Sequence, residues 1–326
     1  MGPESRGVAV GRLALAGGLA GIAVYCWYRS RRQRPQTGPE ARSVRTAASL
    51  ERRDDGPHRS RTAAAAAAAA ASTSTPPAAS RELHALLGAL LAPPGTDTTL
   101  LRRRVLVTLA GRAAFTAAQE EIRAVGGLAV IVGCISNEDA GVREQALNTL
   151  NNLAMNMANQ EVLQEYIPQV VQTIAGSDAH PDVQVAGLRL LTNLTVTDQY
   201  HGQFAGTLPD LWPLIDSDNT QLQALKLFVN LSGNADMKPE ILSLPVASSF
   251  LRLLEAEGSV EVTSRVLFLL KNLAATTDED GAEPGSLRAL LLDGRTEVCA
   301  SVYRLTRHED DGLRETASSI LGSFVT

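Results

Sequence analysis

Apolar residues in the C-terminal part of the chain recur in register with one repeated asparagine. The four asparagines lie 41, 37 and 42 residues apart and are Asn152, Asn193, Asn230 and Asn272. Counted from each asparagine, position −5 is leucine, position −2 is leucine or phenylalanine, and position +1 is leucine. Spacings of three residues put these side chains on one face of a helix. The pattern therefore predicts four copies of one amphipathic helix with a buried apolar face.

Two weaker copies of this helix flank the four. One has Gly111 at the asparagine position, and the other has Ser323 close to the last residue. Turn signals such as Gly126-Gly127 and Pro168 precede further apolar segments between the copies, which predicts additional helices in each interval. Residues 81–326 thus divide into about six units of roughly 41 residues. A period near 40 residues with two or three helices per unit is typical of armadillo and HEAT repeats and indicates an all-α fold.

The first 28 residues predict a membrane anchor. Residues 8–28 contain one charged side chain, Arg12, and as a helix they are long enough to cross a hydrocarbon layer of roughly 30 Å. Aromatic and basic side chains typical of a membrane interface close the span, namely Tyr25, Trp27, Tyr28, Arg29, Arg31 and Arg32. By the positive-inside rule, this basic flank keeps the residues after the span in the cytosol. We expect a short flank over 1–7 and a single-pass signal anchor over 8–28.

Two alternatives concern the same segment. A cleaved signal peptide fits less well than an anchor, because its candidate cleavage site, Ala14-Leu15-Ala16, lies inside the apolar run. Gly17 and Gly21 have the spacing that lets two membrane helices pack closely, which predicts a weak homodimer through the anchor. In a span rich in alanine and glycine the same spacing also arises by chance.

Residues 29–80 predict a disordered tether. They are rich in arginine, alanine, serine and proline, and they contain few side chains that can be buried. Several hydroxyl residues lie among the arginines and are candidate sites for a basophilic kinase: Ser43, Thr46, Ser49, Ser60 and Thr62. Phosphates at these sites would reduce the positive charge near the membrane. An unmodified, solvated linker is the alternative interpretation.

Composition and charge exclude several classes of protein. With 44% hydrophobic but only 4% aromatic residues, leucine- and alanine-rich helix packing is favoured over a β-sandwich. Residues 1–62 have a net charge of +7 and residues 63–326 a net charge of −12, so the repeat region is unsuited to nucleic acid. Three well-separated cysteines exclude a disulfide scaffold and a cysteine-built zinc site. No metal, cofactor or catalytic motif is recognisable, so we expect no metal, no cofactor and no enzymatic activity.

The repeat resembles the armadillo motif, because Gly-Gly-Leu is followed by Val-x-x-x-Ala-Leu-x-x-Leu-x-Asn-Leu-Ala. This resemblance implies a right-handed armadillo-like solenoid over 81–326. With the anchor and the basic linker, the whole chain resembles the armadillo-repeat-containing proteins of the mitochondrial outer membrane, the Armcx cluster and its close relatives. That resemblance implies a scaffold with a cytosolic C-terminal domain that supports mitochondrial distribution and dynamics. Its implied partners are the Miro GTPases and the Trak kinesin adaptors, and the endoplasmic reticulum membrane is the alternative location.

The armadillo resemblance also implies a partner-binding groove lined by the recurrent asparagines. Each carboxamide is expected to hold the N–H and C=O of an extended peptide, or else to bond to neighbouring loops and stabilise the stack. Nuclear-import armadillo proteins have tryptophan at position −4, whereas this chain has Asn148, Arg189, Lys226 and Phe268 there. Arg189 and Lys226 favour an acidic partner segment. The alternative function is therefore a growth and survival regulator that binds and restrains a transcription factor such as p53.

Two of the recurrent asparagines also match glycosylation sequons. These are Asn193-Leu194-Thr195 and Asn230-Leu231-Ser232. Both fall in helices that are predicted to pack in a cytosolic domain. We interpret the sequons as coincidences of the repeat.

Overall fold

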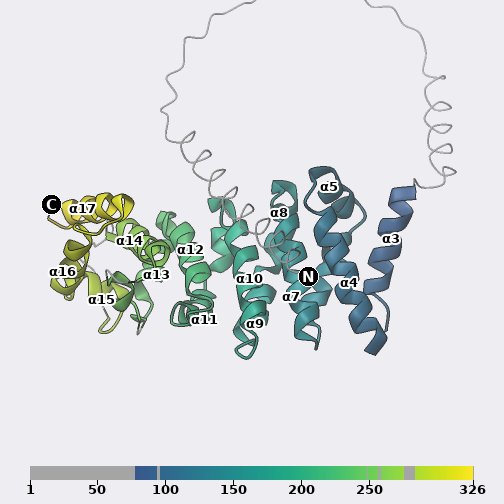
Figure 1. The fold of residues 1–326 in the computed structure, drawn as a ribbon, viewed down its shortest axis with the longest axis horizontal. Coiled ribbons are helices and arrows are strands. Elements are labelled where there is room, and N and C mark those ends of the chain that lie inside the picture. Colours follow the sequence, from purple (N-terminus) through teal and green to yellow (C-terminus); the bar gives the residue numbers. More distant parts are fainter. Residues whose placement is uncertain (1–77, 94–95, 248, 256–257, 275–282, 326) are drawn as a thin grey trace, which may run out of the picture. The chain divides into compact units, whose positions relative to one another are not determined.

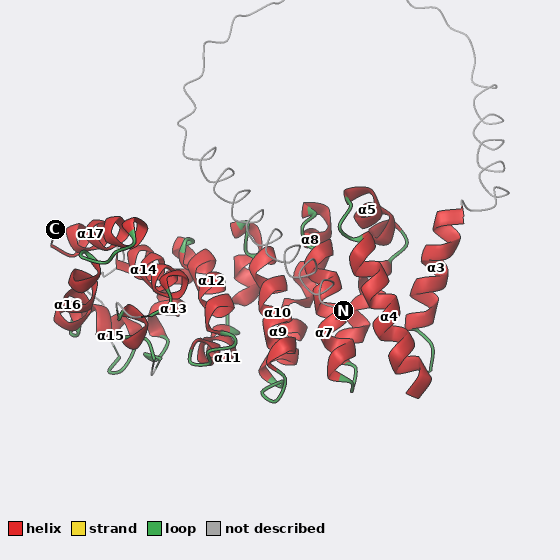
Figure 2. Ribbon diagram, in the orientation of Figure 1, coloured by secondary structure: helices red, strands yellow, loops and turns green. Residues whose placement is uncertain are grey.

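The structure of the chain is a computed structural model that describes residues 78–93, 96–247, 249–255, 258–274 and 283–325. The predicted anchor, its aromatic and basic flank and the candidate phosphorylation sites lie outside these residues. Within the described ranges the secondary structure is helical, apart from an isolated antiparallel bridge between Pro245 and Ser286 (Figure 2). The prediction of an all-helical solenoid is confirmed. No helix in the described part of the chain is long and apolar enough to cross a membrane.

Each repeated asparagine lies near the end of a long helix, which we call the third helix of its unit. The third helices are α4 (Thr96–Arg112), α7 (Ala140–Leu153), α10 (Pro181–Leu194), α12 (Gln221–Ser232), α14 (Val260–Ala274) and α17 (Asp311–Val325). They pack against one another in this order, each on the next (Figure 1). The 41-residue period in the sequence is thus one step from a third helix to its neighbour.

Shorter helical segments precede each third helix. Ahead of α4 lies α3 (Ala78–Leu90), and ahead of α7 lie α5 (Thr116–Ala124), α6 (Gly127–Gly133) and η1 (Cys134–Ser136). Ahead of α10 lie α8 (Met157–Leu163), η2 (Gln164–Tyr166) and α9 (Ile167–Ala175), and ahead of α12 lie η3 (Asp198–Phe204), α11 (Leu208–Leu211) and η4 (Trp212–Ile215). Ahead of α14 lie η5 (Ala235–Met237), α13 (Lys238–Ser243) and η6 (Arg252–Leu254), and ahead of α17 lie α15 (Leu287–Leu292) and α16 (Arg295–Leu305). We call the segments that directly follow a third helix first helices; among them are α5, α8 and η3.

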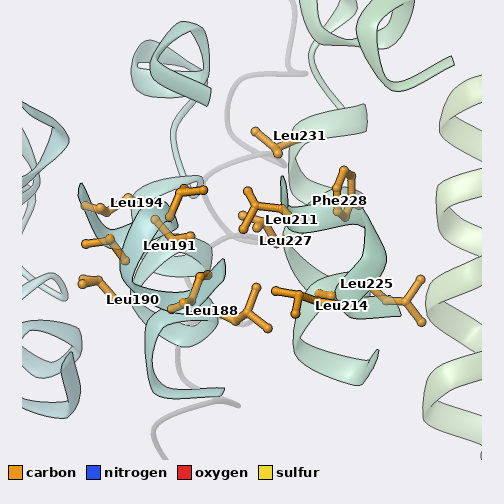
Figure 3. Close-up of a cluster of buried hydrophobic side chains, with 14 of the residues drawn as sticks. Leu188, Leu190, Leu191, Leu194, Leu211, Leu214, Leu225, Leu227, Phe228 and Leu231 are labelled. Carbon is orange, nitrogen blue, oxygen red and sulfur yellow. The ribbon is translucent and has the colours of Figure 1, made fainter. Parts of the chain in front are cut away.

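The apolar positions predicted from the repeat form one continuous core. Leucine at −5, leucine or phenylalanine at −2 and leucine at +1 are fully buried in α7, α10, α12 and α14. Position −3 is buried as well, because it faces the preceding third helix. Figure 3 shows Leu227 of α12 between α10 and α12, and Leu190 on the side of α10 away from α12. Trp212 is buried and packs edge-on against Phe228, with ring centroids 4.8 Å apart.

Position −6 shows how closely the helices approach. It is Gly187 in α10, and a Cβ atom added there would lie 2.2 Å from Cγ2 of Ile174 in α9. The same position is alanine in α7 and α12 and valine in α14. A glycine is therefore required in α10, because α9 packs directly against the backbone of α10.

Candidate functional site

The repeated asparagines join each third helix to the one before it. In every case Nδ2 donates to a backbone carbonyl in the last turn of the preceding third helix. The pairs are Asn152 with Ala110 (3.1 Å), Asn193 with Asn151 (3.2 Å), Asn230 with Thr192 (3.4 Å) and Asn272 with Val229 (3.2 Å). This geometry corresponds to the stack-stabilising alternative that the sequence left open.

In three of these asparagines, Nδ2 also donates to a side-chain oxygen. Asn230 donates to Thr195 Oγ1 at 3.1 Å, and Asn272 donates to Ser232 Oγ at 3.0 Å. Asn193 instead donates to Oδ1 of Asn151, at 3.0 Å, because the residue equivalent to Thr195 in α7 is an alanine. Thr195 and Ser232 are the hydroxyl residues of the two sequons. The sequons therefore have a structural basis in the repeat, which the sequence interpretation missed.

The donor half of each carboxamide is thus engaged in the stack, and Oδ1 of Asn152 also accepts from Nδ2 of Asn151 at 3.5 Å. In Asn193, Asn230 and Asn272 the side-chain hydrogen bonds to described residues all run through Nδ2. All three side chains are half-buried. Their Oδ1 atoms can accept hydrogen bonds from the N–H groups of an extended peptide. Their Nδ2 atoms already donate within the stack and are not offered to the peptide's C=O groups. Peptide binding by these asparagines stays a prediction.

Position −4 lies one helical turn before the asparagine and shares its side of the helix. We call this side of the third helices the open face. Arg189 is exposed and Phe268 is 38% exposed, whereas Asn148 and Lys226 are half-buried. At the two ends of the row, Val107 of α4 and Ser319 of α17 are exposed. The open face therefore presents a different side chain in every unit.

The two predicted basic residues of the open face differ in their partners. Lys226 Nζ lies 2.9 Å from Oε1 of Glu261, in the first turn of α14. Arg189 is not within ion-pair distance of any carboxylate in the described ranges, and its side chain reaches solvent. An acidic partner segment would therefore meet an unpaired guanidinium in α10 and an already paired ammonium in α12.

A second recurrent contact, which sequence reasoning missed, secures the first helices. Side-chain nitrogens of Gln119 and Gln160 donate to the carbonyls six residues earlier, Ala113 and Ala154, both at 2.8 Å. In η3 the same role falls to His201, whose Nε2 lies 3.1 Å from Thr195 O and must carry the proton, because a carbonyl only accepts. Burial lowers the pKa of His201 below its ordinary value. The signal in the sequence was the shared repeat position of these three residues, eight after the asparagine position.

Stacked helical units tied together at the ends of their third helices define an armadillo-type repeat protein. A family model described as Armadillo-like matches residues 79–283, and the chain belongs to that family. Solved structures agree on the fold. A designed armadillo repeat protein in complex with peptide (KR)4 is 18% identical and has a TM-score of 0.60, and the match covers 74% of this chain and 99% of that chain. A computationally designed armadillo repeat protein for modular peptide recognition is 18% identical, with a TM-score of 0.61 and the same coverage.

Proposed function

We propose that this protein binds an extended segment of a partner protein along the open face of its third helices. The observation that carries this proposal is the row of half-buried asparagine Oδ1 atoms beside the variable row at position −4. An extended backbone presents N–H groups to the first row and side chains to the second. The armadillo-like repeat fold is suited to binding peptides and proteins, and the designed protein found with peptide (KR)4 has this fold.

We further propose that the protein acts on the cytosolic side of the mitochondrial outer membrane. The support comes from the sequence, namely the apolar span 8–28, its aromatic and arginine flank, and the resemblance to mitochondrial armadillo-repeat-containing proteins. In this proposal the anchor sets the location, the tether provides reach, and the open face selects the partner. The partners are Miro GTPases and Trak kinesin adaptors, and the result is support of mitochondrial distribution and dynamics.

A second candidate function is favoured by Arg189, which is exposed and has no ion-pair partner among the described residues. Acidic and apolar activation segments of transcription factors such as p53 carry the complementary charge. In this version the protein restrains growth or survival signalling by holding the factor at a membrane, and the endoplasmic reticulum is the alternative site.

Proximity labelling in cells tests the location and separates the two functions. We would compare the full chain, a chain that lacks residues 8–28, and a full chain with Arg189→Glu and Phe268→Ala on the open face. Outer-membrane trafficking proteins labelled by the full chain support the first function, and nuclear proteins support the second. If the chain without residues 8–28 still fractionates with mitochondria, the anchor proposal is wrong.

The open-face variant tests binding separately from location. Its partners should disappear while its membrane fraction stays the same. Arg252→Glu is the matched control, because Arg252 is exposed on η6 and lies outside the third helices. If both variants label the same proteins as the unmodified chain, the open face is not the binding site.

A further inference from the structure

Two of the four described first helices have an asparagine cap, and two, α5 and η3, have no side-chain cap. Four residues after the asparagine position, Asn156 begins α8 and accepts a hydrogen bond from Ala158 N at 3.0 Å, and Asn234 does the same for Asp236 N at 3.0 Å. The residue at this place before α5 is Phe115, which forms no capping bond. Phenylalanine has no side-chain acceptor and cannot cap a helix, whereas Thr197, at the same place before η3, could but forms no capping bond.

Phe115 is one of three exposed apolar side chains near the N-terminal ends of α5 and α8. Phe115 is 70% exposed, and Met155 and Met157, which lie at the start of α8, are 44% and 61% exposed. Helices α5 and α8 pack against each other, and both lie along the upper side of the helical units in Figure 1. We call these three residues the apolar edge. Flexible methionines and an exposed aromatic ring are well suited to take up an apolar side chain of varied shape.

The apolar edge adjoins the exposed arginine of the open face. Met155 Sδ lies 3.5 Å from Nδ2 of Asn193, and Arg189 precedes Asn193 by one turn of the same helix. The neighbouring third helix carries Lys226, which is held by Glu261 at 2.9 Å. Three features therefore follow one another along adjacent units. They are the apolar edge, then Arg189, which has no ion-pair partner in the described ranges, and then Lys226, whose partner Glu261 another carboxylate can replace.

We propose that the open face binds an extended acidic segment that carries an apolar anchor residue. The anchor packs on the apolar edge, one carboxylate pairs with Arg189, and a further carboxylate displaces Glu261 from Lys226. This inference rests on the proposed function and specifies the chemistry of its partner. Packed helices lie about 8–10 Å apart and an extended chain advances about 3.3 Å per residue, so the charged side chains are spaced about three residues apart. The protein as a whole is acidic, so a carboxylate of the partner is attracted locally, at Arg189, and not by the surface in general.

Fluorescence anisotropy with the full-length protein in detergent micelles tests this inference. The labelled probes are three peptides of about nine residues, enough to span four third helices. One has glutamate at every third residue and leucine between, one has glutamate at every third residue and serine between, and one alternates lysine with arginine. We expect the glutamate–leucine peptide to bind most tightly and the lysine–arginine peptide to bind most weakly.

Single substitutions then assign the contacts. Arg189→Glu should weaken the glutamate–leucine peptide about tenfold, because an attraction becomes a repulsion. Phe115→Asn should weaken the same peptide about threefold and leave the glutamate–serine peptide unchanged. Glu261→Gln should tighten both acidic peptides about twofold, because it frees Lys226. Arg252→Glu is the charge-matched control and should change none of the affinities.

The failures of the two proposals differ. If none of the peptides binds the unmodified protein, the open face is not a peptide site and the proposed function fails with this inference. If the lysine–arginine peptide binds as tightly as the glutamate–leucine peptide, or if Arg189→Glu leaves binding unchanged, peptide binding stands and the acidic partner is wrong. Arg189 and Phe115 are exposed, so circular dichroism should show the same helix content in their variants.

Discussion

The two faces of the third helices differ in how much they vary from unit to unit. At position −5 the residues are Leu147, Leu188, Leu225 and Leu267, all fully buried. The next residue in each helix, at position −4, is asparagine, arginine, lysine and phenylalanine in turn. One residue along a helix rotates the side chain by about 100°, from the core towards solvent. The stack thus constrains the first position tightly and leaves the second free to define a partner.

The largest expected contrast between these faces is in stability. Leu191→Ala on the core face should reduce the free energy of unfolding by about 2–5 kcal/mol, because it leaves a cavity where packing is complete. Arg189→Ala, two residues earlier on the open face, should change it by less than about 0.5 kcal/mol. Urea unfolding followed by circular dichroism measures both. Equal losses for the two variants would contradict the distinction between the faces.

The close packing of α9 on α10 predicts the next effect. Gly187→Val should destabilise the protein by about 1–3 kcal/mol, because a side chain at this position collides with Ile174. Gly202→Ala is the control, since nothing lies within 4 Å of a Cβ atom added there. The same unfolding experiment applies. A harmless Gly187→Val would mean that the two helices can separate, and the core face would be less constrained than we infer.

The repeated asparagines lie between the core face and the open face. Their hydrogen bonds are expected to contribute less to the free energy of unfolding than the close packing at Gly187. Asn272→Ala should cost about 1 kcal/mol, because it removes the donor to Val229 O and Ser232 Oγ. Ser232→Ala removes only one of these acceptors. A double-mutant cycle between the two residues should give a coupling free energy of at least about 0.5 kcal/mol. A coupling of zero would show that the bond between Asn272 and Ser232 does not stabilise the stack.

The smallest expected effect on stability at neutral pH is that of replacing His201 in the first helix η3. His201 has a lowered pKa, caused first by burial and partly offset by its bond to Thr195 O and by Asp198. The unfolded chain therefore binds the proton more strongly, so stability should fall as pH drops through the ordinary histidine value of 6.5.

His201→Gln tests this pH dependence, because glutamine fills the same role at Gln119 and Gln160. The variant should match the unmodified protein near pH 8 and lose less of its melting temperature on acidification to pH 5. His180→Gln, at an exposed histidine, is the control and should follow the unmodified protein. If His201→Gln also follows the unmodified protein at every pH, the buried ring is not a source of acid sensitivity.

Much of the fold follows from periodicity alone. A three-residue spacing of leucines and a 41-residue repeat define helices, core positions and the number of units, since both depend only on local geometry and on burial of apolar surface. The partners of polar side chains were not predictable in this way. Lys226 and Arg189 occupy the same repeat position, yet of these two only Lys226 has an ion-pair partner among the described residues. That partner, Glu261, lies 35 residues further along the chain, so the spacing of residues within one helix could not reveal it.

The sequence by itself determined that this protein is a helical repeat of about six armadillo-like units, which residues form its core and which side chains are displayed at position −4. Only the tertiary structure decided the role of the asparagine donors, which bind carbonyls of the preceding third helix, and the basis of the two sequons. It also brought Met155 beside Asn193, although 38 residues separate them in the chain. The reason is that a helical period specifies the direction of a side chain, whereas its hydrogen-bond partner depends on how one unit is placed on the next.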